Sequence, residues 1–363
     1  MNRRWICNDV WMDIFPSFDR PQLGLKLALL SPRFNALVDK HFDGKSELTI
    51  WRTIEIGKDN GTKPKLFVEM DDDNFVEFPL PDYPLPSKIR FDSIQIEYID
   101  HSVFAFLRSN HQIFDKRGTN LELRIPSSDT KDEQPIWDIL AREIWPIFST
   151  NIHHLGFNDG VDLDYLRRLI SPTILTDLNQ LVSINSFDLL PAAIDYDFDV
   201  PNATISAGQI LYKWLHSPRK DGQPKRLRCA DLNKQTNFDW INNFKEHFLR
   251  ANAISSVSYE ISFTVRVPSI VPFELVNEWT KEKLTLAKAK ELGIGWIMKR
   301  CKIIGETAAV QQQKKDENWY NHCNNVIIWL DSSTNYIGPL SPPPEEEEAG
   351  QSSEKGASSA DNE

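Results

Sequence analysis

The sequence has no long apolar run and contains little cysteine. No stretch approaches the roughly 18 consecutive apolar residues that a membrane-spanning helix needs, and no apolar segment follows Arg3 and Arg4. We therefore expect neither a membrane partner nor a signal peptide. The four cysteines lie far apart without a Cys-x-x-Cys pair, which is typical of reduced, buried thiols; they are Cys7, Cys229, Cys301 and Cys323. These features predict a protein of the cytoplasm, the nucleus or both.

Sequence patterns of common catalytic and nucleotide-binding sites are also missing. The chain has no GxxxxGK[ST], GxGxxG, GxSxG or HExxH pattern. In a strand, His153 and His154 would point to opposite sides, and residues 71–73, three aspartates, lack the spacing of an EF-hand. Residues 195–199 place three aspartates on one side of an extended segment, and we interpret them as a polar outward face, with weak calcium binding as the alternative. We expect no enzyme activity, metal or cofactor; an enzyme within the α/β body is the weaker alternative.

Negative charge is concentrated at the C-terminus. The net charge is −11, and residues 341–363 hold seven acidic residues against one lysine, a net −6, which leaves −5 for the rest of the chain. A mildly acidic body gives no electrostatic reason to bind nucleic acid. The one basic run, residues 219–228, is interrupted by Asp221, Gly222 and Pro224, which favours a solvated loop. Residues 341–363 are rich in Pro, Ser and Glu and predict a disordered acidic tail.

Residues 6–38 show the pattern of three short helices. The first has apolar residues at helical spacing after Asn8-Asp9, a candidate N-cap, and stops at Pro16. The second opens with a capping-box pattern at Asp19-Arg20-Pro21-Gln22. Ser31-Pro32 ends this helix and starts the third. A segment of about 40 residues buries too little surface to be stable alone, so its apolar face must pack on the rest of this chain, as a helical cap, or on another protein.

The residue order in this segment resembles an F-box, a motif of about 40 residues. The matching positions are Asp9-Val10, Ile14-Phe15, Leu23, Leu27, Leu30-Ser31, Arg33-Phe34 and Leu37. The resemblance implies binding to a Skp-type adaptor, which bridges to a cullin-RING ubiquitin ligase. It assigns seven residues jointly to that interface and to the module's own small core: Val10, Ile14, Phe15, Leu23, Leu27, Leu30 and Phe34. Ile6-Cys7 replaces the leucine–proline start of the motif, and Pro32 lies within its Ser-x-Arg-Phe segment.

The rest of the chain predicts an α/β body. Residues 48–56, 65–70 and 75–80 have strand patterns, and Asn60-Gly61 is typical of a hairpin turn. From residue 91 onward, strand and helix patterns alternate through residue 267, followed by further strand and helix and a last strand at residues 326–330. We predict an irregular leucine-rich-repeat-like βα domain, with a doubly wound sheet as the alternative. Short phrases within residues 171–175, 214–219, 272–275, 282–286 and 296–301 also resemble the region after the F-box in a nematode F-box-like family.

Together these patterns predict an α/β protein in four parts. They are an F-box-like module at residues 5–42, a β-rich connecting segment at 46–88, a target-binding α/β domain at 89–340 and the acidic tail. The leading hypothesis is a substrate-recognition adaptor of a cullin-RING ubiquitin ligase that binds a protein target through its α/β body. Because Cys7 lacks the fixed backbone angle of proline, the alternative is an interaction scaffold whose degenerate F-box no longer engages a ligase.

Overall fold

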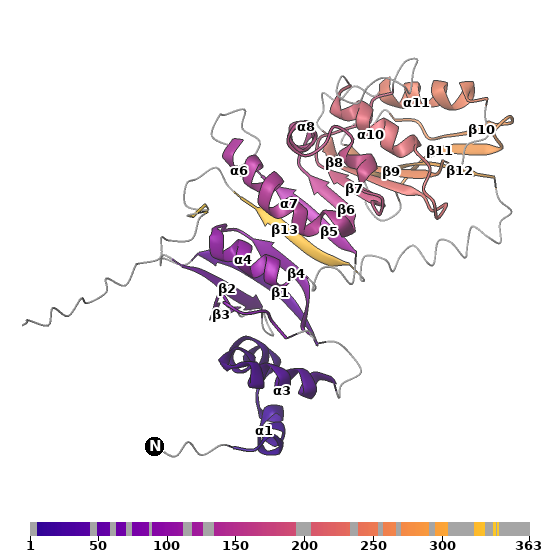
Figure 1. Cartoon of the computed structure of the whole chain (residues 1–363). Helices are drawn as coiled ribbons and strands as arrows, with labels where there is room; N and C mark the ends of the chain where they lie inside the picture. Colours follow the sequence, from indigo (N-terminus) through magenta and orange to yellow (C-terminus); the bar gives the residue numbers. More distant parts are fainter. Residues whose placement is uncertain are drawn as a thin grey trace, which may run out of the picture.

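The fold combines a cluster of N-terminal helices with one large mixed sheet (Figure 1). The computed structural model describes residues 6–43, 49–58, 63–69, 75–86, 89–111, 118–125, 134–193, 205–232, 239–252, 257–265, 270–289, 295–303, 323–330, 337–338 and 340. The predicted Asn60-Gly61 turn, the aspartates at 71–73 and 195–199, and the tail at 341–363 lie outside the described residues.

The N-terminal helices lie where the sequence predicts them. Their bounds are α1 (Asn8–Ile14), η1 (Phe15–Ser17), α2 (Arg20–Gln22), η2 (Leu23–Leu27), η3 (Ala28–Leu30) and α3 (Pro32–Asp43). As predicted, the Asp19 side chain caps α2 by accepting a hydrogen bond of 2.8 Å from the Gln22 amide. The predicted Asn8-Asp9 cap is wrong: the N-cap residue of α1 is Cys7, which makes no side-chain cap bond, and the Asn8 side chain bonds Arg33 instead.

Three antiparallel strands begin the sheet. They are β1 (Thr49–Lys58), β2 (Pro64–Glu69) and β3 (Phe75–Pro79). On its other side β1 pairs in parallel with β4 (Ile89–Ile96), with Ile54 opposite Ile94. Residues 46–88, predicted as a connecting segment, therefore supply strands to the same sheet as residues 89–340.

The central strands are parallel and follow one another across the sheet in chain order. After β4 come β5 (Thr119–Arg124), β6 (Ile152–Phe157), β7 (Ser183–Ser186), β8 (Lys225–Leu232) and β9 (Tyr259–Val265). The helices between them are α4 (His101–Ser109); α6 (Gln134–Ile139), η5 (Leu140–Ile144), α7 (Trp145–Phe148) and η6 (Ser149–Asn151); α8 (Gly160–Leu169) and α9 (Ile174–Asp177); α10 (Ala207–His216); and α11 (Asp239–Arg250).

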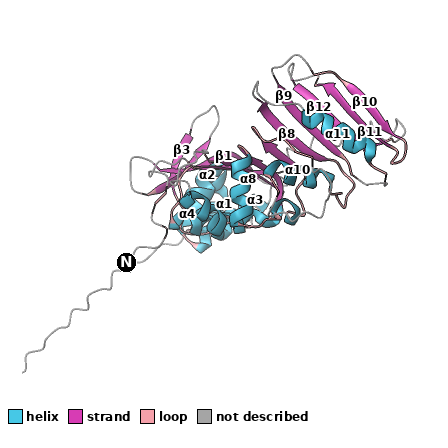
Figure 2. Ribbon diagram, turned by 90° about the horizontal axis from the view of Figure 1, so that it is seen from above, coloured by secondary structure: helices cyan, strands magenta, loops and turns pink. Residues whose placement is uncertain are grey.

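All of these helices lie on one face of the sheet (Figure 2). Parallel crossovers are almost always right-handed, so strands added in a single direction carry their helices to the same side. A doubly wound sheet has helices on both faces, and that alternative is therefore wrong. The chain has the mixed α/β class that the sequence predicts, with a single helical layer in the part that the structure describes.

The last strand, β13 (Asn324–Trp329), is inserted between β4 and β5. Val326 lies opposite Ile94 on one side and Leu121 on the other, and both pairings are parallel. The chain then passes beside the end of β4, where Ile99 and Ile337 form a bridge. A Cβ atom added at Gly338 would lie 1.9 Å from the Tyr98 hydroxyl oxygen, so only glycine fits this crossing.

An antiparallel group closes the other end of the sheet. Beyond β9 lie β12 (Gly295–Lys302), β11 (Glu282–Lys288) and β10 (Phe273–Asn277). The sequence predicted both strand and helix after residue 272. The helix part of that prediction is wrong within residues 270–289, 295–303 and 323–330, where the structure has only strands, turns and extended segments.

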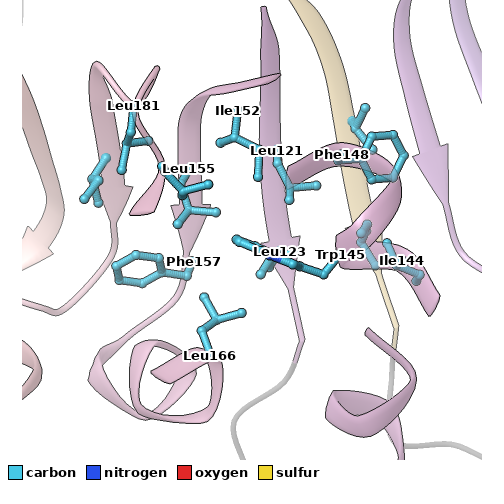
Figure 3. Packing of buried hydrophobic residues seen from close by; sticks show 14 of the residues in the cluster. Leu121, Leu123, Ile144, Trp145, Phe148, Ile152, Leu155, Phe157, Leu166 and Leu181 are labelled. Atoms are coloured by element: carbon cyan, nitrogen blue, oxygen red, sulfur yellow. The ribbon is translucent and has the colours of Figure 1, made fainter. Parts of the chain in front are cut away.

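The hydrophobic core lies between the sheet and its helices. Along β5, Leu121 and Leu123 point to the helical side and are fully buried, whereas Asn120, Glu122 and Arg124 keep part of their surface accessible on the other side. Figure 3 shows Leu121 and Leu123 packed among side chains from α7, α8 and β6, including Trp145, Phe148, Leu155, Phe157 and Leu166. The strand alternation therefore gives one buried and one accessible sheet face.

Candidate functional site

The N-terminal helices are held together by the beginning of α3. The Arg33 guanidinium donates hydrogen bonds of 2.7 Å from Nη2 to the Ile6 carbonyl and to the Asn8 Oδ1 atom. Next to it, the Phe34 ring meets the Trp11 ring edge to face, with centroids 4.9 Å apart. These contacts attach α1 to α3, so the two ends of the predicted module form one structural unit.

The structure divides the seven predicted site residues between the module core and its surface. Phe15 and Leu23 are only 0% and 1% exposed and belong to the core. Val10 and Leu30 are 43% and 65% exposed. Three residues are half-buried: Ile14, Leu27 and Phe34. Val10 and Leu30 therefore present large apolar side chains that the rest of the module does not cover.

Ile6 belongs to this accessible set, although the sequence reading did not include it. Its side chain is 46% exposed. Its carbonyl oxygen, which lies just before the N-terminus of α1, accepts a hydrogen bond from Arg33. An apolar residue before the N-cap, together with Trp11 one turn into the helix, has the spacing of a hydrophobic staple. This spacing is the sequence pattern that could have identified Ile6 and Trp11 as functional residues of the module. We name Ile6, Val10, Ile14, Leu30 and Phe34 the docking surface.

The opposite side of the module faces the sheet. The Lys26 ammonium lies 5.1 Å from the centroid of the Phe78 ring of β3, and the Asn35 amide lies 3.5 Å from the Pro84 carbonyl oxygen. Leu25, Val38 and Phe42 are buried in the continuous core. In Figure 1, α1 lies on the side of α3 away from the sheet. The body therefore covers one side of the module and leaves α1 accessible.

A group of ionisable side chains lies between α10 and strands β9, β11 and β12, remote from the docking surface. Arg300 and Glu282 form a buried ion pair in which Nη2 donates to Oε2 at 2.6 Å. The rings of Tyr212 and His216 stack with centroids 3.9 Å apart, and His216 also meets the ring of Tyr259. These contacts pair ionisable and aromatic groups with one another across the core.

Lys225 extends this buried network at the start of β8. Its ammonium donates to the Trp214 carbonyl and, at 2.5 Å, to the Ser217 hydroxyl. Burial, followed by the nearby charge of Arg219, lowers the pKa of Lys225 to about 8. A cavity at the start of β6 is lined by other residues. The arrangement thus fixes α10 on the sheet, and none of these groups lines that cavity.

The paired histidines at the start of β6 have separated rings and differ in burial. His153 and His154 have ring centroids 6.5 Å apart, and burial, then the charges of His153 and two arginines, lower the pKa of His154 to about 3. Within the described ranges, no group of three or more His, Cys, Asp or Glu side chains is arranged to hold a metal ion.

Two further sequence predictions are corrected in detail. The basic run at residues 219–228 is a loop only in its first part, because β8 begins at Lys225 and that side chain is buried. Of the four thiols, which form no disulfide, only Cys229 is buried; burial raises its pKa to about 12. Cys7 is exposed.

Comparisons with known protein families, with curated proteins and with solved structures found no match to this chain. Among the described helices, none is both long and apolar enough to span a bilayer.

Proposed function

We propose that the chain is a substrate-recognition adaptor of a cullin-RING ubiquitin ligase. Its N-terminal module, an F-box by resemblance, would bind a Skp-type adaptor through the docking surface, and its α/β body would bind a protein target. Transfer chemistry would belong to the partner enzymes, so the chain needs rigidity and two interfaces rather than catalytic groups.

The accessible apolar side chains of the module carry this proposal. Val10 and Leu30 are large and exposed, and α1, which carries Val10, lies on the side of α3 away from the sheet (Figure 1). Burying one such side chain against a partner contributes about 1.5–3 kcal/mol. Phe15 and Leu23, in contrast, support the module from inside. A rigid helical unit with an apolar outer side is the arrangement that a helix-binding partner requires.

The body supports the second interface. Its helices all lie on one face (Figure 2), and the other face presents polar side chains in rows across the parallel strands. Asn120 and Asn325, for example, share a side-chain hydrogen bond of 2.9 Å across β5 and β13. We propose that this one-sided sheet is an irregular leucine-rich-repeat-like arc and that its accessible face contributes to target binding.

Binding to a purified Skp-type adaptor tests the proposal directly. The double variant Val10→Glu/Leu30→Glu should lose at least about 2 kcal/mol of binding, roughly 30-fold in Kd, because charges replace apolar anchors. Both residues are exposed, so stability should change by no more than about 0.5 kcal/mol for each. Leu249→Glu is the matched control, since Leu249 is 52% exposed on α11, in the body. Equal affinity of the wild type, the double variant and Leu249→Glu for the adaptor would refute the proposed role of the docking surface.

The scaffold alternative is tested at Cys7. The backbone angles of Cys7, φ −67° and ψ 159°, are those that proline adopts, and the residue precedes the first turn of α1. Cys7→Pro should therefore fold normally and preorganise the module, stabilising it by about 0.4–1 kcal/mol. Adaptor binding by the wild type supports the ligase function. Binding by Cys7→Pro alone, with none by the wild type, would favour a scaffold with a degenerate F-box.

A further inference from the structure

A cavity opens on the α/β body where β6 begins. Its volume is about 480 Å³, within the range of roughly 300–1,000 Å³ that is typical of ligand pockets. The floor is apolar and includes Trp145, Ile152 and Ile174, which are all buried side chains. Trp145 and Ile152 belong to the packed layer shown in Figure 3. The rim is polar and includes Asp177 and Gln180. The cavity therefore suits a ligand with an apolar stem and a polar head.

Asp177 is the one charged residue that lines the cavity. The Ser171 and Thr173 hydroxyls donate to its Oδ2 atom at 2.6 and 2.9 Å. These bonds hold the carboxylate in place without neutralising it, and its Oδ1 atom accepts no further bond from the described residues. A fixed carboxylate beside an apolar floor attracts a cationic group, because a charge-assisted bond is about twice as strong as a neutral one.

One helix end adds to the negative potential. The continuous helical run from α6 to η6 ends at Asn151, and Ser149 and Thr150 from its last turn line the cavity. Ile170 and Ser171, which follow α8, also line it, but Arg167 and Arg168 in the last turn of α8 offset the negative charge of that helix end. The last carbonyl groups of a helix carry partial negative charge and favour a cation. This electrostatic feature is independent of Asp177.

The wall that carries Asp177 is already ordered by its own backbone. The Asp177 amide donates to the Thr173 carbonyl at 3.0 Å, and the Leu178 amide donates to the Ile174 carbonyl at 3.2 Å. The Val182 amide then bonds the His153 carbonyl at 2.8 Å, which joins the segment to β6. A preformed wall spares a ligand the entropic cost of ordering it.

We propose that this cavity is a peptide-binding site for an arginine or lysine side chain of a partner protein. The methylene stem would lie along Trp145 and Ile174, and the cationic head would bond Asp177 Oδ1. Long basic side chains combine these two properties, since the stem buries against apolar surface while the head stays polar. This inference goes beyond the proposed ligase function and requires only the α/β body, so it is tested without any Skp-type adaptor.

Selection from a displayed library of random heptapeptides tests the site, with the full-length wild type and the Asp177→Asn variant as parallel baits. We expect peptides enriched in Arg or Lys on the wild type and absent from the variant. The selected peptide is then resynthesised with citrulline, the neutral isostere of arginine, and measured by calorimetry against the wild type, Asp177→Asn and the control Asp188→Asn. Asp188 is an exposed carboxylate outside the cavity lining.

The expected result is a loss of affinity of about tenfold for citrulline on the wild type, which is the scale of a partly exposed charged hydrogen bond. Replacing arginine by citrulline in the peptide should not change its affinity for Asp177→Asn. The same replacement should lower its affinity for Asp188→Asn as much as for the wild type. The citrulline comparison needs no protein variant, so a folding defect in Asp177→Asn would not obscure it. Three results would overturn the proposal: no selected peptides, selected peptides without basic residues, or equal binding of the arginine and citrulline forms.

Discussion

Glu55 provides a quantitative test of the electrostatics of the sheet. It lies on β1 opposite Gln95 of β4, and Glu97 follows just after β4 ends at Ile96. Burial, then the charge of Glu97 and a hydrogen bond to it, raise the pKa of Glu55 from 4.5 to about 7. The amide of Gln95 donates to Glu97. The arrangement favours a protonated Glu55 in the folded chain.

The sign of the pH dependence follows from this shift. The folded state binds more protons than the unfolded state between pH 4.5 and about 7, so the stabilisation from protonated Glu55 is complete below pH 4.5 and is lost as the pH rises through about 7. A shift of 2.5 pKa units corresponds to about 3.4 kcal/mol for a fully shielded group. Because the side chain is half-buried, solvent screening reduces this to about 1–2 kcal/mol.

Urea unfolding at pH 5 and pH 8.5 measures the effect. Glu55→Gln should be more stable than the wild type by about 1–2 kcal/mol at pH 8.5 and should differ by less than about 0.5 kcal/mol at pH 5. Comparing the two proteins at each pH cancels the titration of groups that do not interact with Glu55. An identical difference at both pH values would refute the assignment, because the benefit of a neutral amide must depend on ionisation of the acid that it replaces.

Three further predictions concern stability. Glu282→Gln leaves Arg300 buried without its carboxylate and should cost about 3–5 kcal/mol in denaturant unfolding; a cost below about 1 kcal/mol would contradict the buried pair. Gly338→Ala places a Cβ atom 1.9 Å from the Tyr98 hydroxyl oxygen, so a thermal melt should show a lower midpoint than the wild type. Leu23→Ala removes a fully buried side chain of the module and should cost about 2–5 kcal/mol by chemical unfolding, whereas an unchanged midpoint would place Leu23 outside the core.

Local features of the fold were predictable from the sequence. Apolar spacing located the N-terminal helices and most strands of the parallel region, since both depend on which side of an element is buried. At the start of α10, Ser206 and Gln209 form both hydrogen bonds of a capping box, and their Ser-x-x-Gln spacing is visible in the sequence. Asp19 likewise caps α2. Each of these patterns is complete within a few residues, so no distant contact was needed to interpret it.

Non-local features were not predictable in this way. A strand pattern at residues 326–330 gave no information on its neighbours, and β13 lies between β4 and β5, more than 200 residues away in sequence. The division of the docking residues also depends on tertiary packing. Phe15 and Val10 have similar apolar character and lie on adjacent parts of one segment, yet the rest of the module encloses only Phe15. Asn8, a good N-cap residue, instead bonds Arg33, 25 residues later.

The central claim is that the side of the N-terminal module away from the sheet binds a Skp-type adaptor. Amide hydrogen exchange of the full-length chain, with and without saturating purified adaptor, tests it most directly, because exchange reports local protection along the backbone. We predict added protection at residues 6–14 and 27–34, with unchanged exchange at α11. Protection confined to the α/β body, or none at a concentration that saturates binding, would contradict it.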